Sequence, residues 1–254
     1  MNFNDNSPSV FHQFFKYVSF NILGMLGLSC YILADTFFIS KGMGADGLTA
    51  LNLAIPVYSF IHGSGLMIGI GGATRYSLLK NGSSRQAMDL VFSRSVLYAL
   101  GFSCMFVFAG IFFPNQLSRL LGADANVHQM TSSYLQVILV FAPAFMMNNV
   151  LLAFIRNDGN PRLSMLAMIT GSLSNIVLDY LFIFPMGMGI FGAALATGFA
   201  PLISIAISVP ISWETDTIPF EKSGAIPFLR FGHWFFGSFR FDHGVILRNC
   251  HDRI

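Results

Sequence analysis

Long apolar runs, rather than amphipathic periodicity, dominate the pattern of hydrophobic and polar positions along the chain. A helix that crosses a bilayer needs about 20 mainly apolar residues. Six stretches meet this requirement, and they predict transmembrane helices at residues 14–40, 48–74, 91–113, 130–155, 163–184 and 188–211. The predicted fold class is therefore all-α, a polytopic membrane protein built as a six-helix bundle.

Short polar breaks with turn-forming residues separate these runs. They are too short for crossover connections, so consecutive helices are expected to be antiparallel neighbours. Pro56 and Pro143 lie within two of the runs and predict kinks. Gly65 and Gly69 have the spacing of close helix packing in membranes.

Lys and Arg are distributed unevenly between the two sets of loops, and short cytoplasmic loops retain positive charge. Only Lys41 and Arg119 belong to one set. The other set comprises the N-terminus and the segments after the second and fourth helices, and contains Lys16, Arg75, Lys80, Arg85, Arg94, Arg156 and Arg162. This asymmetry predicts a multi-pass protein of the cell (inner) membrane with a cytoplasmic N-terminus, residues 1–13.

The composition supports the membrane assignment and excludes other classes. The chain is 54% hydrophobic and 10% charged, against roughly 45–50% and about 25% in soluble domains. A net charge of +2 without a basic stripe argues against nucleic-acid binding. No hydrolase or nucleotide-binding motif is present, so we expect neither an enzyme nor a cofactor. The three scattered cysteines predict neither a disulfide framework nor zinc.

The composition changes after about Pro210. Residues 213–254 contain 10 of the chain's 26 charged residues. We expect the six-helix lobe to occupy residues 14–211 and a polar, divergent cytoplasmic tail to occupy residues 212–254. The aromatic stretch around Trp234 is either an interfacial segment or part of a disordered tail.

Two aspartates lie inside predicted spans, where a charged side chain costs on the order of 2.5–3.5 kcal/mol. These are Asp35 in the first span and Asp179 in the fifth, and both are candidates for a cation or proton site. Asn175 precedes Asp179 by one helical turn, so the two side chains share a face. Asp35 could instead be hydrated near the interface, because it lies roughly 9 Å of helix from Lys41.

Several segments, in order and spacing, resemble the N-terminal lobe of multidrug and toxic compound extrusion (MATE) transporters. They are Ala34–Ser40, Leu53–Pro56, Ile155–Arg162, Asn175–Tyr180 and Gly189–Thr197. The resemblance implies an antiporter that exports cationic, amphipathic compounds in exchange for sodium ions or protons. It also implies twelve helices in two six-helix lobes, with the substrate cavity between the lobes.

The resemblance further implies an ion-coupling site in this lobe. The family's carboxylate on the first helix matches Asp35, and its Asn and Asp on the fifth match Asn175 and Asp179; these three are the expected ligands if the ion is sodium. A threonine on the sixth helix matches Thr197. The family's amide on the fourth helix matches Asn149 or its neighbour Asn148, although such amides often only connect helices by hydrogen bonds.

The sequence also departs from the family pattern. It covers only the first lobe, and residues 213–254 resemble neither the family's linker nor a seventh helix. The expected form is therefore a truncated, half-length transporter whose partner is a second copy of the chain or a missing C-terminal lobe. Two alternatives stay open: a transporter that flips lipid-linked saccharides, and a non-functional fragment or interaction protein.

Overall fold

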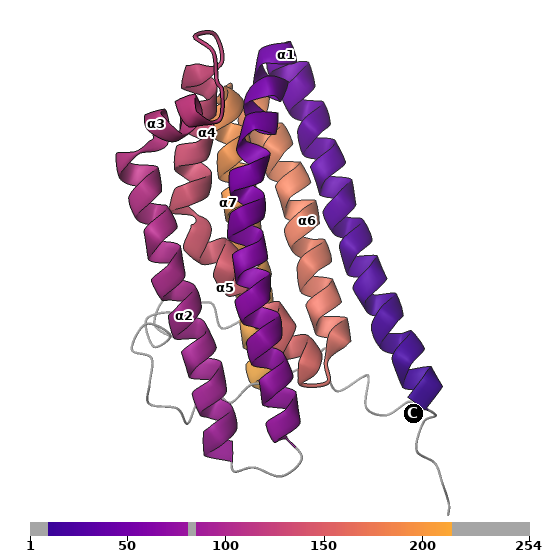
Figure 1. Ribbon diagram of the computed structural model, residues 1–254. Coiled ribbons are helices and arrows are strands. Elements are labelled where there is room, and N and C mark those ends of the chain that lie inside the picture. Colours follow the sequence, from indigo (N-terminus) through magenta and orange to yellow (C-terminus); the bar gives the residue numbers. More distant parts are fainter. Residues whose placement is uncertain (1–9, 81–84, 215–254) are drawn as a thin grey trace, which may run out of the picture. The chain divides into compact units, whose positions relative to one another are not determined.

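The computed structural model describes residues 10–80 and 85–214, and within these ranges the elements are all helices (Figure 1). They are α1 (Val10–Leu79), α2 (Arg85–Phe112), α3 (Pro114–Leu120), α4 (His128–Val140), α5 (Ala142–Asn157), α6 (Pro161–Ile183) and α7 (Gly189–Glu214). Residues 215–254, which include most of the predicted tail and the predicted segment around Trp234, lie outside the described residues.

Helix α1 consists of two antiparallel legs. Its 70 residues would extend about 105 Å if straight, whereas the hydrocarbon core of a bilayer is about 30 Å thick. Gly44, with φ 67° and ψ −149°, is non-helical and reverses the chain at this point (Figure 1). This backbone region is essentially restricted to glycine. The predicted first two helices are therefore confirmed, and the loop between them is reduced to a corner at Gly44.

The predicted fourth span is a bent pair. Helices α4 and α5 meet at an angle of 47°, and Pro143 lies in the first turn of α5, where its missing N–H does least harm. The predicted kink at Pro143 is confirmed. Pro56, in contrast, lies inside the second leg of α1, where the backbone stays helical.

Most of the helices are suited to crossing a membrane. By length and composition four helices qualify, and the bent pair of α4 and α5 makes a fifth. Since α1 turns back at Gly44, its two legs count as separate passes, which gives the six that were predicted. The short helix α3, which begins at Pro114, was not predicted.

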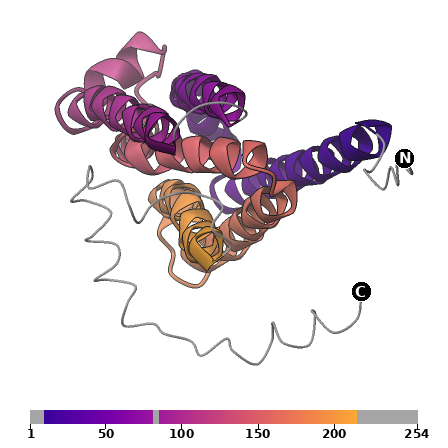
Figure 2. The same cartoon turned by 90° about the horizontal axis from the view of Figure 1, so that it is seen from below.

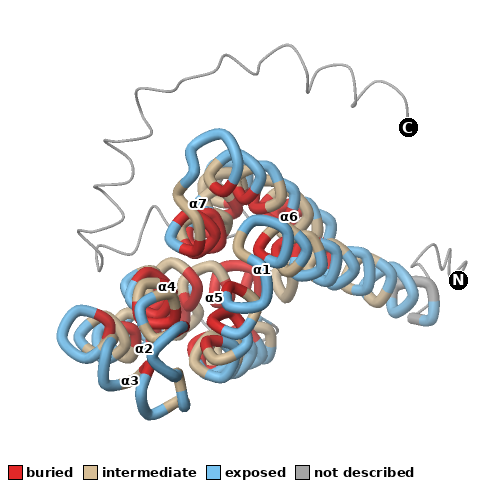
Figure 3. The backbone as a smooth tube through the Cα atoms, turned by 90° about the horizontal axis from the view of Figure 1, so that it is seen from above, coloured by how far each residue is buried: buried red, intermediate tan, exposed pale blue. Residues whose placement is uncertain are grey.

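Helix α5 occupies the centre of the bundle. It contacts α1 and α2 on one side and α6 and α7 on the other (Figure 2). All six residues from Val150 to Ile155 are at most 7% exposed. Viewed from above, the buried positions lie on the mutually facing sides of the helices (Figure 3). The outward positions are apolar, including Leu33, Met67 and Leu97, which are 72%, 71% and 65% exposed. An apolar outer surface is what lipid contact requires.

Two glycines allow the second leg of α1 to pack closely against α5. A Cβ atom added at Gly65 would lie 3.0 Å from the Cα atom of Met146. One added at Gly69 would lie 3.1 Å from the Cα atom of Val150. Since both neighbours are backbone atoms that cannot easily move, the predicted close packing at Gly65 and Gly69 is confirmed.

Lys80 and Arg156, which follow the second and fourth predicted helices, lie at one end of the bundle, which we call the basic end. Lys80 Nζ lies 3.0 Å from Asp158 Oδ1 and also donates to the Asp158 carbonyl oxygen at 2.9 Å. Arg156 Nη1 donates to Asn21 Oδ1 at 2.6 Å. Ser77 Oγ donates to the carbonyl oxygen of Asn157 at 3.2 Å. Both legs of α1 are thus tied to the turn between α5 and α6.

Candidate functional site

The two intramembrane aspartates lie inside the bundle, on different helices. Asp35 is in the first leg of α1 and is 6% exposed, and Asp179 is in α6 and is fully buried. They are close enough to interact electrostatically. Asp35 therefore faces the protein interior and not the hydrated interface.

Asn175 and Thr197 hold the Asp179 side of this group. In the amide orientation that satisfies both of its ends, Asn175 Nδ2 donates to Asp179 Oδ2 at 3.1 Å, and Asn175 Oδ1 accepts from the Thr197 backbone N–H at 3.1 Å. Asn175 is fully buried and Thr197 is 5% exposed. The one-turn spacing of Asn175 and Asp179 thus places both side chains on one face of α6, and Thr197 completes the group from α7.

Each carboxylate retains an unused oxygen. Within the described part of the chain, neither Asp35 Oδ1 nor Asp179 Oδ1 has a hydrogen-bond partner. A buried polar atom without a partner costs on the order of 1–3 kcal/mol, and more when it is charged. Two such carboxylate oxygens are suited to a proton or to a hard cation that prefers oxygen ligands.

Three tyrosines surround the carboxylates, and sequence reasoning missed them. The hydroxyls of Tyr31 and Tyr58 are 3.0 Å apart. Tyr134, 4% exposed, interacts with Thr197 and lies within electrostatic reach of both aspartates. Tyr31 could have been found, because it precedes Asp35 by one helical turn. Tyr134 reaches the group from α4 and had no comparable signal.

Asn149 does not join this group. Its Nδ2 donates to the carbonyl oxygen of His62 at 3.3 Å and contacts His62 Nδ1 at 3.2 Å. The His62 ring in turn stacks on Tyr58, with 5.9 Å between the ring centroids. The structure therefore brings together four of the five predicted ion-coupling residues, and it places Asn149 in a contact between α5 and the second leg of α1.

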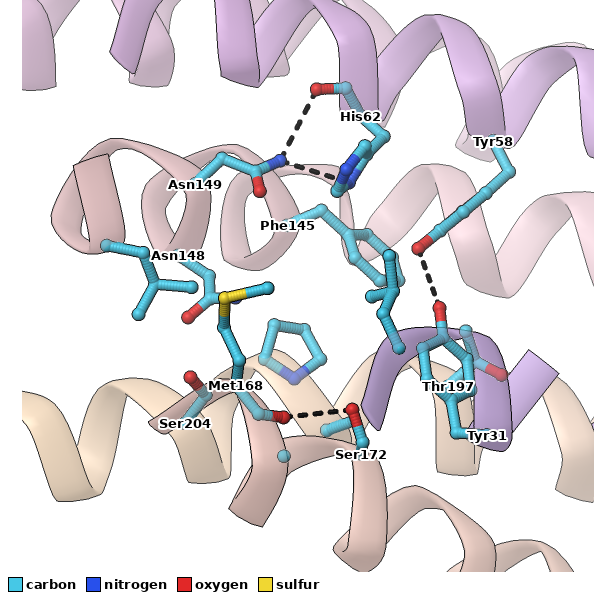
Figure 4. Close-up of a pocket in the computed structure, with 15 residues that line it drawn as sticks. Tyr31, Tyr58, His62, Phe145, Asn148, Asn149, Met168, Ser172, Thr197 and Ser204 are labelled. Carbon is cyan, nitrogen blue, oxygen red and sulfur yellow. Dashed lines mark hydrogen bonds between the residues drawn. The ribbon is translucent and has the colours of Figure 1, made fainter. Parts of the chain in front are cut away.

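A small cavity of about 70 Å³ lies between α1, α5, α6 and α7 (Figure 4). Tyr31 and Thr197 connect its wall to the aspartate group, and Asn149 with His62 forms another part of the wall. Among the described residues, the lining contains no Lys, Arg, Asp or Glu. The cavity wall is thus mostly apolar, with a few amide, hydroxyl and imidazole groups.

Comparison with known proteins shows which family has this sequence. The MatE family profile matches residues 21–181. The multidrug export protein MepA of Staphylococcus saprophyticus is 30% identical over 183 residues, which cover 72% of this chain and 41% of that protein. MepA of Staphylococcus aureus strain MRSA252 is 28% identical over 179 residues, which cover 70% and 40% of the two chains. The chain thus spans less than half the length of these relatives.

Comparison with solved structures points to the same family. An outward-facing multidrug resistance MATE family transporter of the MOP superfamily matches with a TM-score of 0.70 at 28% identity, covering 82% of this chain and 45% of that one. An inward-facing structure of such a transporter matches with a TM-score of 0.67 at 29% identity, covering 72% and 41%. The chain is an all-α polytopic membrane protein that aligns to one half of these transporters, and it is not of an enzyme family. By its profile, its relatives and its fold, the chain belongs to the MATE family.

Proposed function

We propose that the chain is one lobe of an antiporter that exports cationic, amphipathic compounds in exchange for sodium ions or protons. The observation that carries the proposal is the pair of buried aspartates, each with an oxygen free of partners among the described residues, inside a membrane bundle. An intramembrane carboxylate is costly, and its usual justification is an ion or proton pathway.

In this proposal Asp35 and Asp179 exchange the coupling ion. Two carboxylates within electrostatic reach of each other repel when both are charged, so binding of a proton or sodium ion removes an unfavourable interaction. Asn175 fixes the orientation of Asp179 through the 3.1 Å bond to Oδ2, and Thr197 contributes its hydroxyl. Asn149 then acts indirectly, by holding α5 against His62. An ion that binds one arrangement of the lobes better than another shifts the balance between them.

The cavity lining argues against a cargo that carries a phosphate group. A transporter of lipid-linked saccharides must neutralise a phosphate group, for which Lys or Arg is the usual partner. The described lining supplies neither. Export of drugs also agrees with the names of the relatives, two of which are multidrug export proteins.

Two further points of the proposal concern orientation and partner. The basic end faces the cytoplasm, because short cytoplasmic loops retain Lys and Arg. The second wall of the transport pathway comes from another polypeptide segment, either a C-terminal lobe or a second copy of this chain. A second copy is geometrically reasonable, since parallel repeats in transporters are related by an axis along the membrane normal.

The test is ethidium efflux from cells that lack their own drug pumps, at matched membrane expression. We expect Asp35→Asn and Asp179→Asn each to abolish efflux. Asp46→Asn is the matched control, because Asp46 is exposed beside the corner at Gly44 and should leave efflux unchanged.

The same assay addresses the partner and the ion. Efflux by the chain alone supports a second copy as the partner, whereas efflux only on co-expression of a C-terminal lobe supports the two-lobe form. A sodium or pH gradient imposed on vesicles identifies the coupling ion. Efflux that survives both aspartate substitutions would overturn the proposal.

A further inference from the structure

The cavity extends beyond the aspartate group toward the basic end. Helix α7 begins at Gly189, at the end opposite the basic end, and enters the cavity wall at Thr197. The wall continues along the same helix to Ser204, seven residues further, which is about 10 Å of helix. The cavity thus reaches well past the residues assigned to ion coupling.

This deeper part of the cavity has two unused polar atoms. Neither Asn148 Oδ1 nor Ser204 Oγ has a hydrogen-bond partner in the described part of the chain. Ser204 is 2% exposed. The two side chains come from α5 and α7 and lie on facing sides of the cavity (Figure 4). Since buried polar groups are normally satisfied, this pair is arranged for a ligand that occupies the space between them.

Helix α7 supplies a third oxygen between this pair and the aspartate group. Pro201, which lines the cavity, has no N–H and cannot donate to the carbonyl oxygen four residues earlier, that of Thr197. That carbonyl oxygen is freed from its helical bond. The position of Ser204 is fixed by close packing, because a Cβ atom added at Gly171 of α6 would lie 3.2 Å from the Ser204 Cβ atom.

Ser204 differs from the other buried serines of this interface. Ser172 donates to the Met168 carbonyl oxygen at 2.9 Å, and Ser208 donates to that of Ile205 at 3.2 Å. Both hydroxyls are therefore satisfied by their own helices. Met168 also lines the cavity beside Ser204 (Figure 4). Its flexible side chain can move aside more easily than a branched one.

We propose that Asn148 and Ser204 form a relay point through which the coupling cation, carrying water, passes between the aspartates and the basic end. This inference rests on the proposed function, because it assigns a route to the ion that Asp35 and Asp179 bind. The neutral oxygens of Asn148, Ser204 and the Thr197 carbonyl replace part of the cation's hydration shell. Being uncharged, they hold it weakly enough for it to leave, as conduction requires.

Cysteine accessibility tests the route without relying on transport. In a background where the three native cysteines are replaced by serine, Ser204→Cys and Asn148→Cys are labelled with a small cationic thiosulfonate. The matched control is Ser103→Cys in α2, since Ser103 is fully buried, donates to the Leu100 carbonyl oxygen and is outside the cavity lining. Inside-out vesicles expose the end that we assign to the cytoplasm.

We expect both cavity variants to react at least tenfold faster than Ser103→Cys when the reagent is added to inside-out vesicles. Reaction no faster than the control, or faster only in right-side-out vesicles, would overturn the route. Asn148→Cys provides an independent measurement should Ser204→Cys insert poorly. Labelling without ethidium efflux, either by the chain alone or with a C-terminal lobe, would show an accessible path but reject the antiporter, whereas efflux without labelling would reject the route alone.

Discussion

At the scale of single residues, the two amides that the family resemblance suggested as ion ligands have different partners. Asn175 bonds to Asp179, whereas Asn149 bonds to His62. A ligand that binds only the folded state stabilises it, by about 2.7 kcal/mol at one hundred times its dissociation constant. The two amides should therefore differ in their effect on ion-dependent stability.

We expect Asn175→Ala to remove most of the thermal stabilisation that sodium or acid gives the purified protein in detergent. Asn149→Ala should lower the melting temperature at every ion concentration and keep the ion-dependent increment. Thermal unfolding with and without the ion measures both. If both variants lost the ion-dependent increase in melting temperature equally, Asn149 would belong to the ion site.

A second residue-scale prediction concerns Asp158 at the basic end. Burial raises the pKa of this carboxyl above its ordinary value, and the ion pair with Lys80 only partly opposes the effect. A group whose pKa is raised by folding contributes stability at acid pH, and this contribution is lost as the pH rises through the folded-state pKa. The wild type should therefore lose stability relative to Asp158→Asn as the pH is raised from about 4, the ordinary pKa of an aspartate, through the raised folded-state pKa.

Melting temperatures of the two proteins across this pH range test the sign. Asp46→Asn is the control, because Asp46 is exposed and outside the ion pair. A difference that changes in the opposite direction would mean that the attraction of Lys80 outweighs the burial of Asp158.

At the scale of elements, the glycines in the second leg of α1 have two distinct environments. A Cβ atom at Gly69 would lie 3.0 Å from the Asn149 carbonyl oxygen, whereas one at Gly71 meets nothing within 4 Å. Overpacking costs about 1–3 kcal/mol, and alanine gains about 1 kcal/mol over glycine in a helix. Gly69→Ala should lower the melting temperature, and Gly71→Ala should leave it unchanged or raise it. Equal effects would contradict the close packing of α1 on α5.

The elements were largely predictable because the bilayer imposes a single length and polarity on each span. The predicted range 163–184 corresponds to α6 at Pro161–Ile183. Helix α3 was not predicted, because its seven residues are too few to show an apolar pattern. Contacts between helices that are distant in the sequence could not be predicted for another reason. The hydrogen bond of Asn149 to His62, for example, joins positions that are 87 residues apart in the chain. Periodicity reports which face of one helix is polar, not which helix lies opposite.

At the scale of the whole molecule, this lobe resembles outward-facing and inward-facing relatives about equally. The fold of this lobe therefore does not distinguish the two conformations. The contacts at the basic end connect both legs of α1 to the turn between α5 and α6, which opposes separate movement of these helices.

The corner at Gly44 also has an electrical consequence. Backbone groups that a helix reversal leaves unpaired need water, which sets the corner at the membrane surface. Asp35 precedes Gly44 by nine residues, about 13 Å of helix, within a hydrocarbon core about 30 Å thick. A cation that reaches Asp35 from that surface crosses about four-tenths of the membrane field. At about 2.3 kcal/mol per charge per 100 mV, the transmembrane voltage alone changes its affinity by about 1 kcal/mol per 100 mV, roughly fivefold.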